Sequence, residues 1–256
     1  MKRFLKKWLC ASHVRNARMI HFALASGVVG VFLVPFDPLW LLGAFIAFQL
    51  YWICGLTCGW HRYFCHGAFE TSRFWQEFML LMGCASLCGH PGAFAAVHLQ
   101  HHKYSDTPKD PHLEYTDAVF AATKLAGIKL GTREKKRFFM SPMMRRAHKY
   151  YLAYPVGVAL LMLAISPAAY VYLWALPVGV MQLLRKYLLV LVPHNPKIGY
   201  RNYDTKDLSR NVWSLGILFG GEGYHNNHHR KPRDWNFAHK WWEFDPASLF
   251  VRMIKR

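Results

Sequence analysis

Two long stretches without charged side chains constrain the fold of this chain more than any other feature. Between Met19 and Cys58 the only Asp, Glu, Lys or Arg is Asp37, and residues 150–184 contain none. A helix needs roughly 20 apolar residues to cross a bilayer, so each stretch is long enough for two spans. Turn signals rich in proline lie near the midpoints, at residues 35–38 and 166–167. We therefore expect two transmembrane hairpins.

Composition and charge agree with a membrane protein. Hydrophobic residues make up 53% of the chain and aromatic residues 16%. The alternative is a soluble helical protein with two buried hairpins. Neither hairpin tip contains Lys or Arg, whereas residues 1–18 contain six, residues 124–149 nine and residues 195–256 eleven. By the positive-inside rule, both termini and the middle loop face the cytoplasm. A net charge of +18 could also indicate a nucleic-acid-binding protein, but no nucleic-acid-binding motif is present. We therefore expect the bases to face the anionic lipids of the inner leaflet.

These patterns predict a single domain, residues 1–256, of the all-α integral membrane class. Four transmembrane helices would form the stem, and a cytoplasmic helical cap would complete it. Residues 78–97 are apolar enough to cross the membrane, but a crossing would place the histidines described below on opposite sides. We expect a broken helix in the interface there, interrupted at 90–92. The parts are a basic lead-in at the membrane surface (1–18), a hairpin (19–58), a cytoplasmic and interfacial segment (59–149), a hairpin with an extended last helix (150–193) and the cap (194–256).

Histidines gather in three clusters. The pattern His-x-x-His-His occurs twice, and a pair separated by four residues precedes both copies. On a helix, residues i, i+3 and i+4 share a face, so each His-x-x-His-His group is predicted to point its three imidazoles the same way. Neutral imidazole is a common metal ligand, and clusters at this spacing indicate metal binding. The candidate ligands are His61 and His66, then His98, His101 and His102, then His225, His228 and His229.

Chain geometry adds detail and a ninth candidate. His66 lies five residues after His61, off the α-helical face, so we expect a backbone turn near Gly67 to bring it back. If residues 167–194 are helical they cover about 40 Å, which is about 10 Å more than the hydrocarbon core. His194 would therefore stand clear of the lipid at the level of the other histidines. One zinc ion needs only three or four ligands, so nine histidines favour two metals, and iron with nitrogen ligands can activate O₂.

Nearby carboxylates are expected to orient these rings. A ligating imidazole usually donates its second N–H to a carboxylate or a carbonyl oxygen, which favours Asp106, Asp110 and Glu222 for that task. His112 is expected to support the second cluster rather than to bind metal. No glycine-rich nucleotide fingerprint follows a strand, so no bound nicotinamide or flavin is predicted. Surface or packing roles are expected for the remaining tempting residues, namely His13, His21, His148, His239, Tyr51, Trp52 and Trp60, although the last three could line a substrate tunnel.

These motifs together resemble the three histidine boxes of the membrane fatty acid desaturases. The matching segments are residues 61–66, 98–112 and 221–229, and the likeness extends from about Gly55 to Asp245, including residues 241–245. The stearoyl-CoA desaturase type and its bacterial relatives are the most similar. The resemblance implies a mushroom-shaped fold with four stem helices, a bacterial-type inner membrane rather than endoplasmic reticulum, and His194 as the ninth ligand. One departure is Val190, where the animal enzymes have an asparagine that holds water near the metal site.

The resemblance also implies a reaction. Two iron ions, with O₂ as co-substrate, would introduce a cis double bond into a saturated acyl chain. A separate ferredoxin, rubredoxin or cytochrome b5-type protein would donate the electrons. The bases of residues 124–149 could meet the phosphates of CoA or of lipid headgroups. Acyl-CoA is the favoured carrier, and an acyl-lipid is the second. The alternative functions are a related lipid or carotenoid hydroxylase or ketolase, many of which have three residues inside the first box where this chain has four, and a metal-binding protein without activity.

Overall fold

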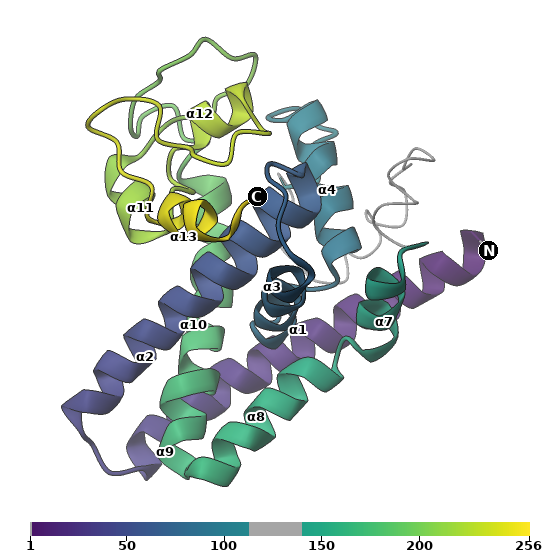
Figure 1. Ribbon diagram of the computed structural model, residues 1–256, viewed down its shortest axis with the longest axis vertical. Helices are drawn as coiled ribbons and strands as arrows, with labels where there is room; N and C mark the ends of the chain where they lie inside the picture. Colours follow the sequence, from purple (N-terminus) through teal and green to yellow (C-terminus); the bar gives the residue numbers. More distant parts are fainter. Residues whose placement is uncertain (1, 113–139) are drawn as a thin grey trace.

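A computed structural model describes residues 2–112 and 140–256. Within these residues the secondary structure is helical, and the only strand-like features are three isolated bridges. Long helices form a stem, and a cap of short helices and loops lies beyond one end of α2 (Figure 1). The predicted all-helical membrane class is therefore confirmed. Residues 113–139, which include most of the bases predicted to meet acyl-CoA, lie outside the described residues.

The first hairpin consists of α1, Lys2–Leu33, and α2, Pro38–Leu50, which continues directly into the π-helix η1, Tyr51–His66. Asp37 ends the turn between α1 and α2, because its extended backbone allows its carboxylate to accept the Leu39 N–H at 2.8 Å. Pro38 at the first helical position lacks an N–H that would otherwise be unsatisfied. The predicted turn at residues 35–38 is confirmed.

The second hairpin is built from more pieces. It contains α7 (Pro142–Tyr150), α8 (Ala153–Ile165), α9 (Pro167–Tyr170), the π-helix η3 (Val171–Ala175), α10 (Leu176–Lys186) and the π-helix η4 (Tyr187–Leu191). Ser166 caps α9 by accepting the Ala169 N–H at 3.0 Å, and Pro167 is at the first helical position. The predicted turn at residues 166–167 is thus confirmed.

Three helical segments are long and apolar enough to cross a membrane: Val14–Leu33, Pro38–His66 and Pro167–Arg185. The predicted third span is shorter than expected. Helix α8 has 13 residues, or about 20 Å, and reaches a bilayer thickness only together with α7, from which it is bent by 62°. The described residues therefore contain three candidate spans, or four if the bent pair is one span.

Two other expectations can be compared with the helices. The basic lead-in is not a separate surface helix, because α1 continues without a break from Lys2 into the first span. The stretch 78–97 is broken, as predicted, because α3, Arg73–Ala85, and α4, Pro91–Tyr104, are separated by residues 86–90. The break lies earlier than the expected 90–92, since Pro91 and Gly92 form the first turn of α4. At 13 and 14 residues, α3 and α4 measure about 20 Å each, too short to cross.

Glycines allow the two hairpins to pack closely. A Cβ atom on Gly27 of α1 would lie 2.7 Å from the backbone nitrogen of Leu176, and one on Gly179 of α10 would lie 2.6 Å from the Cα atom of Leu24. The two glycines therefore accept each other's helix backbones, as small residues do between membrane helices. Close contact between α1 and α10 thus joins the first hairpin to the second.

The cap follows the last long helix. It contains α11, Trp213–Leu218, α12, His225–Arg230, and α13, Pro246–Ile254, connected by loops. Helix α13 packs against η1, and Trp52 of η1 donates its indole N–H to the Phe219 carbonyl at 3.0 Å. These contacts hold the third histidine cluster above the end of η1, where the first cluster lies.

Candidate metal centre

The first histidine pair lies at the end of the π-helix η1. In a π-helix the hydrogen bonds run from residue i to i+5, so residues five apart lie nearly on one face. His61 and His66 are therefore on the same side, with ring centroids 5.0 Å apart. The expected turn at Gly67 exists, with φ +60°, but it follows His66 and does not bring it back. The expectation was wrong because it assumed α-helical geometry.

The second cluster, on α4, divides between two directions. With 3.6 residues per turn, His98 and His102 are about 40° apart around the helix, whereas His101 and His102 are about 100° apart. The Nε2 atoms of His98 and His102 are 2.9 Å from each other. The His101 ring instead lies 4.9 Å from the ring of His194. The prediction that all three imidazoles point the same way was therefore wrong.

The third cluster, on α12, divides in the same manner. His225 and His229 are four residues apart, and their Nε2 atoms are 3.0 Å from each other. His228 lies between them in sequence and faces the other way, with its Nε2 atom 2.8 Å from that of His102. Each His-x-x-His-His pattern thus contributes two rings to one site and one ring to a second site. Two adjacent sites, rather than one, result from this spacing.

Five histidines make up the first site. The Nε2 atom of His61 lies 2.9 Å from the Nε2 atoms of both His98 and His228. His102 Nε2 approaches the same two atoms to 2.9 and 2.8 Å. The ring of His66 lies 4.8–5.0 Å from the other four rings. One potential ligand nitrogen from each residue lies within 4.8 Å of all the others.

Four histidines make up the second site. The Nε2 atom of His225 lies 3.1 Å from that of His194 and 3.0 Å from that of His229. His101 completes the group, with its ring centroid 5.0 Å from that of His229. His194 reaches the site from the turn after η4, far in sequence from the three boxes. The structure therefore brings all nine predicted histidines into two groups of ligand-sized dimensions.

Carboxylates hold the outer edges of four rings. In each pair the Nδ1–H of a histidine donates to an acidic side chain, which leaves the Nε2 lone pair directed into the site. The pairs are His61 with Glu222 at 2.7 Å, His101 with Asp110 at 2.9 Å, His194 with Asp106 at 3.0 Å and His229 with Asp207 at 2.8 Å.

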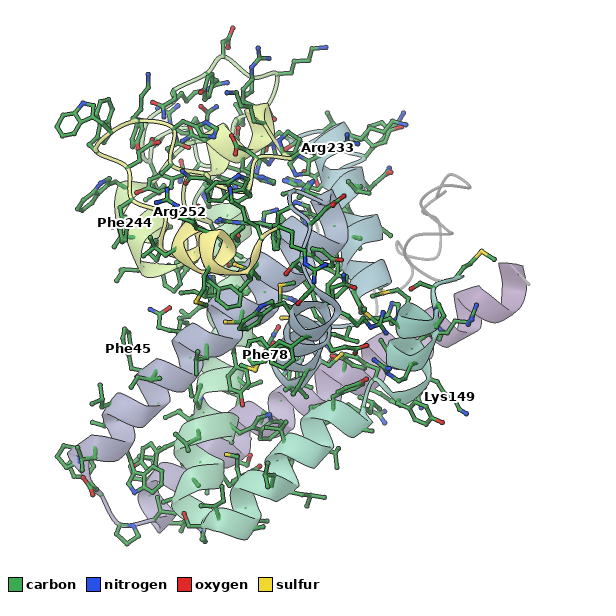
Figure 2. All side chains as sticks on the ribbon, in the orientation of Figure 1. Phe45, Phe78, Lys149, Arg233, Phe244 and Arg252 are labelled. Carbon is green, nitrogen blue, oxygen red and sulfur yellow. The ribbon has the colours of Figure 1, made fainter. Side chains whose placement is uncertain are left out.

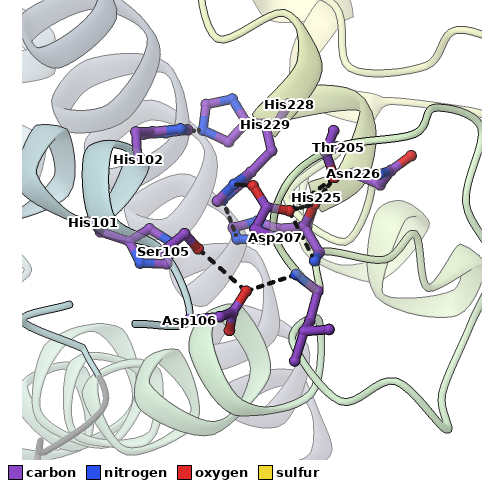
Figure 3. Close-up of polar contacts among 12 residues, drawn as sticks. His101, His102, Ser105, Asp106, Thr205, Asp207, His225, Asn226, His228 and His229 are labelled. Carbon is purple, nitrogen blue, oxygen red and sulfur yellow. Dashed lines mark hydrogen bonds and ion pairs between the residues drawn. The ribbon is translucent and has the colours of Figure 1, made fainter. Parts of the chain in front are cut away.

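Asp207 was missed in the sequence. It lies 22 residues before His229 in a polar loop, and no local spacing connects the two residues. Figure 3 shows its carboxylate among His229, Thr205 and their neighbours. Thr205 donates to the same carboxylate at 2.9 Å, and the Ser209 N–H does so at 3.0 Å. Burial would raise the pKa of Asp207, but hydrogen bonds from the Ser209 hydroxyl, the Ser209 N–H and Thr205 outweigh burial and lower it.

Burial keeps the imidazoles neutral. The pKa values of His98, His102, His225, His228 and His229 lie well below the ordinary 6.5, first because the rings are removed from water and second because other histidines surround them. A neutral imidazole offers a free lone pair, which is the form that binds metals. The nitrogens are thus available as ligands at neutral pH.

The donor sets fit metal ions. Nitrogen ligands lie about 2.1 Å from a transition metal, so two of them at right angles are about 3.0 Å apart. The Nε2 atoms here approach one another to 2.8–3.3 Å. Where a carboxylate accepts a hydrogen bond from Nδ1–H, the proton stays on Nδ1 and Nε2 cannot donate to its neighbour. Converging Nε2 lone pairs would therefore repel one another without a cation among them. Each group therefore has the composition and the spacing of a metal site.

The remaining candidate residues are placed as follows. The ring of His112 lies 4.6 Å from that of His101, and its backbone N–H donates to Asp110. His239 pairs with Asp234 at 3.3 Å, away from both sites. The side chain of Val190 lies outside the described part of the structure. Trp52 stacks on Phe48, and Trp60 meets Phe64 edge to face. His148 lies beside His90.

Comparison with known proteins identifies the family. Residues 38–252 match the family model described as fatty acid desaturase. The sn-1 stearoyl-lipid 9-desaturase of Anabaena variabilis is 29% identical over 82% of this chain and 79% of its own length. Delta-9 acyl-lipid desaturase 2 of Arabidopsis thaliana is 27% identical over 87% of this chain and 75% of its own length. The probable acyl-CoA desaturase of Schizosaccharomyces pombe is 26% identical over 95% of this chain and 54% of its own length. With two histidine sites in a helical membrane protein, this chain belongs to the fatty acid desaturase family.

Proposed function

We propose that this desaturase introduces a cis double bond into a saturated acyl chain, using O₂ and two iron ions held at the two histidine sites. The observation that supports the proposal most is the convergence of nine imidazoles in two groups, four of them oriented by carboxylates. The family match favours desaturation over the hydroxylase or ketolase alternative.

The two sites would differ in ligand number. His61, His66, His98, His102 and His228 would hold one iron, and His101, His194, His225 and His229 would hold the other. Bound iron supplies O₂ activation, and nitrogen ligands with an open position suit that task. An iron held by four histidines would have more open coordination positions for an additional ligand than one held by five.

The chain's own groups prepare these sites. Glu222, Asp106, Asp110 and Asp207 fix one tautomer each, so the Nε2 lone pairs point inward before metal arrives. Burial also lowers the pKa values of five of the rings, which protects them from protonation: those of His98, His102, His225, His228 and His229. Asp106 also accepts the Leu208 N–H at 2.7 Å, which ties the loop after α4 to the cap.

The reaction needs reducing equivalents and a carrier. One acyl chain loses two hydrogens while O₂ is reduced to two waters, so two electrons must come from a small redox protein and two protons from solution. Acyl-CoA is the proposed carrier, with membrane lipid as the second candidate. The bases of α7 support the first, because Arg145, Arg146 and Lys149 are exposed beside the stem, although Arg146 also pairs with Glu77.

Orientation is part of the proposal. The positive-inside rule, applied to the bases outside the hairpins, favours a cytoplasmic location for both termini and for the histidine sites. A cysteine introduced near Pro91 or Gly92 should never react with an impermeant thiol reagent added outside intact cells. Reaction from outside would contradict this orientation.

Expression in a bacterial host tests the activity. New double bonds should appear in fatty acid methyl esters, and a His228→Ala variant at the same level in the membrane should form none. Purified protein with iron, a reductant and a redox protein would then receive stearoyl-CoA or a distearoyl phospholipid. Desaturation of the phospholipid alone would contradict acyl-CoA as the carrier, and hydroxylated product without alkene would contradict desaturation.

A further inference from the structure

An apolar groove lies between the second span and the last helix of the cap. Its volume is about 460 Å³. Phe45, Leu50 and Ile53 line one wall, and Leu249 and Met253 of α13 line the other. The only lining amide belongs to Gln49, which donates to the Leu218 carbonyl at 3.2 Å. The groove therefore offers a ligand hydrocarbon contacts and almost no polar ones.

The span places this groove at membrane depth. Phe45 lies seven residues after Pro38, and Cys54, which also lines the groove, lies sixteen after it. These positions are about 10 Å and at most about 24 Å from the start of the span, within a hydrocarbon core of roughly 30 Å. Water is absent at that depth, and Phe45 is 57% exposed. Lipid chains must therefore meet this side of α2.

Helix α13 has the character of an interfacial helix. Leu249 is 54% exposed and Met253 68% exposed, on the side of the groove. Arg252, Lys255 and Arg256 are all exposed at its C-terminal end. An exposed apolar face with nearby cations is typical of helices that lie among lipid headgroups and bind their phosphates.

The loop leading into α13 supports the same placement. Trp241 is 92% exposed, and Trp242 and Phe244 are about half exposed. Trp213 of α11 donates its indole N–H to the Trp242 carbonyl at 3.1 Å, so these aromatics form one edge of the cap. Figure 2 shows Phe244 on the same side of the molecule as Phe45 of α2. Exposed tryptophans gather where a protein meets the membrane interface.

We infer that the groove between α2–η1 and α13 binds one acyl chain of a membrane phospholipid, with its phosphate at the basic end of α13. The cap is then seated in the leaflet nearest to it rather than standing clear of the membrane, and this is the cytoplasmic leaflet in the proposed orientation. This site lies on the outer surface of η1, separate from the histidine sites, and does not depend on the proposed reaction.

Photolabelling tests the inference directly. The wild-type protein is placed in vesicles of phosphatidylcholine and phosphatidylglycerol. These vesicles include a phosphatidylcholine that carries a diazirine in the middle of one acyl chain. After irradiation, mass spectrometry should find label in α13, Pro246–Ile254, as well as in α2. Label in α2 and α8 without label in α13 would overturn the inference.

Lipid retention provides the second measurement. A Leu50→Trp/Leu249→Trp variant fills part of the groove, and Leu160→Trp/Leu163→Trp makes the same change on the exposed surface of α8. Native mass spectrometry should find one phospholipid on the wild-type chain and on the α8 variant, and about tenfold less on the groove variant. Equal retention by all three would overturn the inference, as would a lipid-free dimer with the groove at its interface. Unchanged thermal unfolding would show that the groove variant is folded.

Discussion

Arg62 and Asp245 form a two-pronged ion pair in the interior of the protein, with nitrogen–oxygen distances of 2.8 and 3.2 Å. The same guanidinium donates to the carbonyls of Gly220 and Trp235, each at 2.7 Å. It also lies 4.0 Å from the centre of the Phe237 ring. One fully buried cation therefore connects the first histidine box to the loops on both sides of the third.

Replacing Arg62 by Met should destabilise the protein and release metal. The variant leaves the Asp245 carboxylate buried without its cation, which costs about 3–5 kcal/mol. The control is Arg73→Met, because Arg73 pairs with Glu77 at the surface and should contribute less than about 1 kcal/mol. Thermal unfolding and iron content measured on both variants check the prediction. Equal effects would mean that the buried pair has no special role.

The division of the boxes predicts how double variants lose metal. His98→Ala/His102→Ala removes two ligands from one site and should leave about one iron per chain. His98→Ala/His101→Ala removes one ligand from each site and should weaken both. Iron content after dialysis against a weak chelator distinguishes the two patterns. Identical losses would favour a single site with all three imidazoles on one side.

His194→Ala should reduce iron from two to about one per chain and abolish desaturation. His194 belongs to no box, but its Nε2 atom lies 3.1 Å from that of His225 and Asp106 holds its Nδ1 atom. His239→Ala is the matched control, because His239 lies away from both sites and pairs with Asp234. Two irons and normal activity in His194→Ala would exclude this residue as a ligand.

Asp207→Asn should weaken the four-histidine site without unfolding the cap. The asparagine amide lacks the negative charge that accepts the His229 N–H. Loss of such a partner typically lowers metal affinity by roughly 10–100-fold. Competition with a chelator measures this affinity. Asp204→Asn changes a fully exposed carboxylate in the same loop and should have no effect. A similar loss in both variants would show that the loop charge matters, and not the contact with His229.

The metal-free protein should lose stability as pH falls below about 6.5. In the folded chain the pKa values of His98, His225 and His228 are depressed, whereas in the unfolded chain they are near 6.5. Below pH 6.5 the unfolded state binds more protons, so the free energy of unfolding falls by about 1.4 kcal/mol per pH unit for each such ring until the folded pKa is reached. Thermal unfolding after chelator treatment should show a lower midpoint at pH 5.5 than at pH 7.5. A constant midpoint would contradict neutral, buried rings.

Several features could be predicted because they depend on local patterns. Uncharged stretches longer than a bilayer require membrane helices, and the Asp37-Pro38 and Ser166-Pro167 pairs end and restart helices through capping and fixed φ angles. The metal-binding character of the histidine boxes likewise depends on residue type and short spacing.

Other features depend on geometry that these patterns do not contain. The i→i+5 bonds of η1 place His66 beneath His61, and no residue type in 51–66 distinguishes a π-helix from an α-helix. The bend between α7 and α8, which shortens the third span, could not be predicted either. The length of an uncharged stretch does not specify whether its helix is straight or bent.

By itself, the sequence determined the membrane class, the turns and the identity of the nine imidazoles, because hydrophobic length, capping and side-chain chemistry are local properties. Only the tertiary structure decided which ring joins which site, that Asp207 holds His229, and that Arg62 meets Asp245 across 183 residues. Those partners come from separate elements, and their contacts exist only after η1, α4 and the cap have packed together.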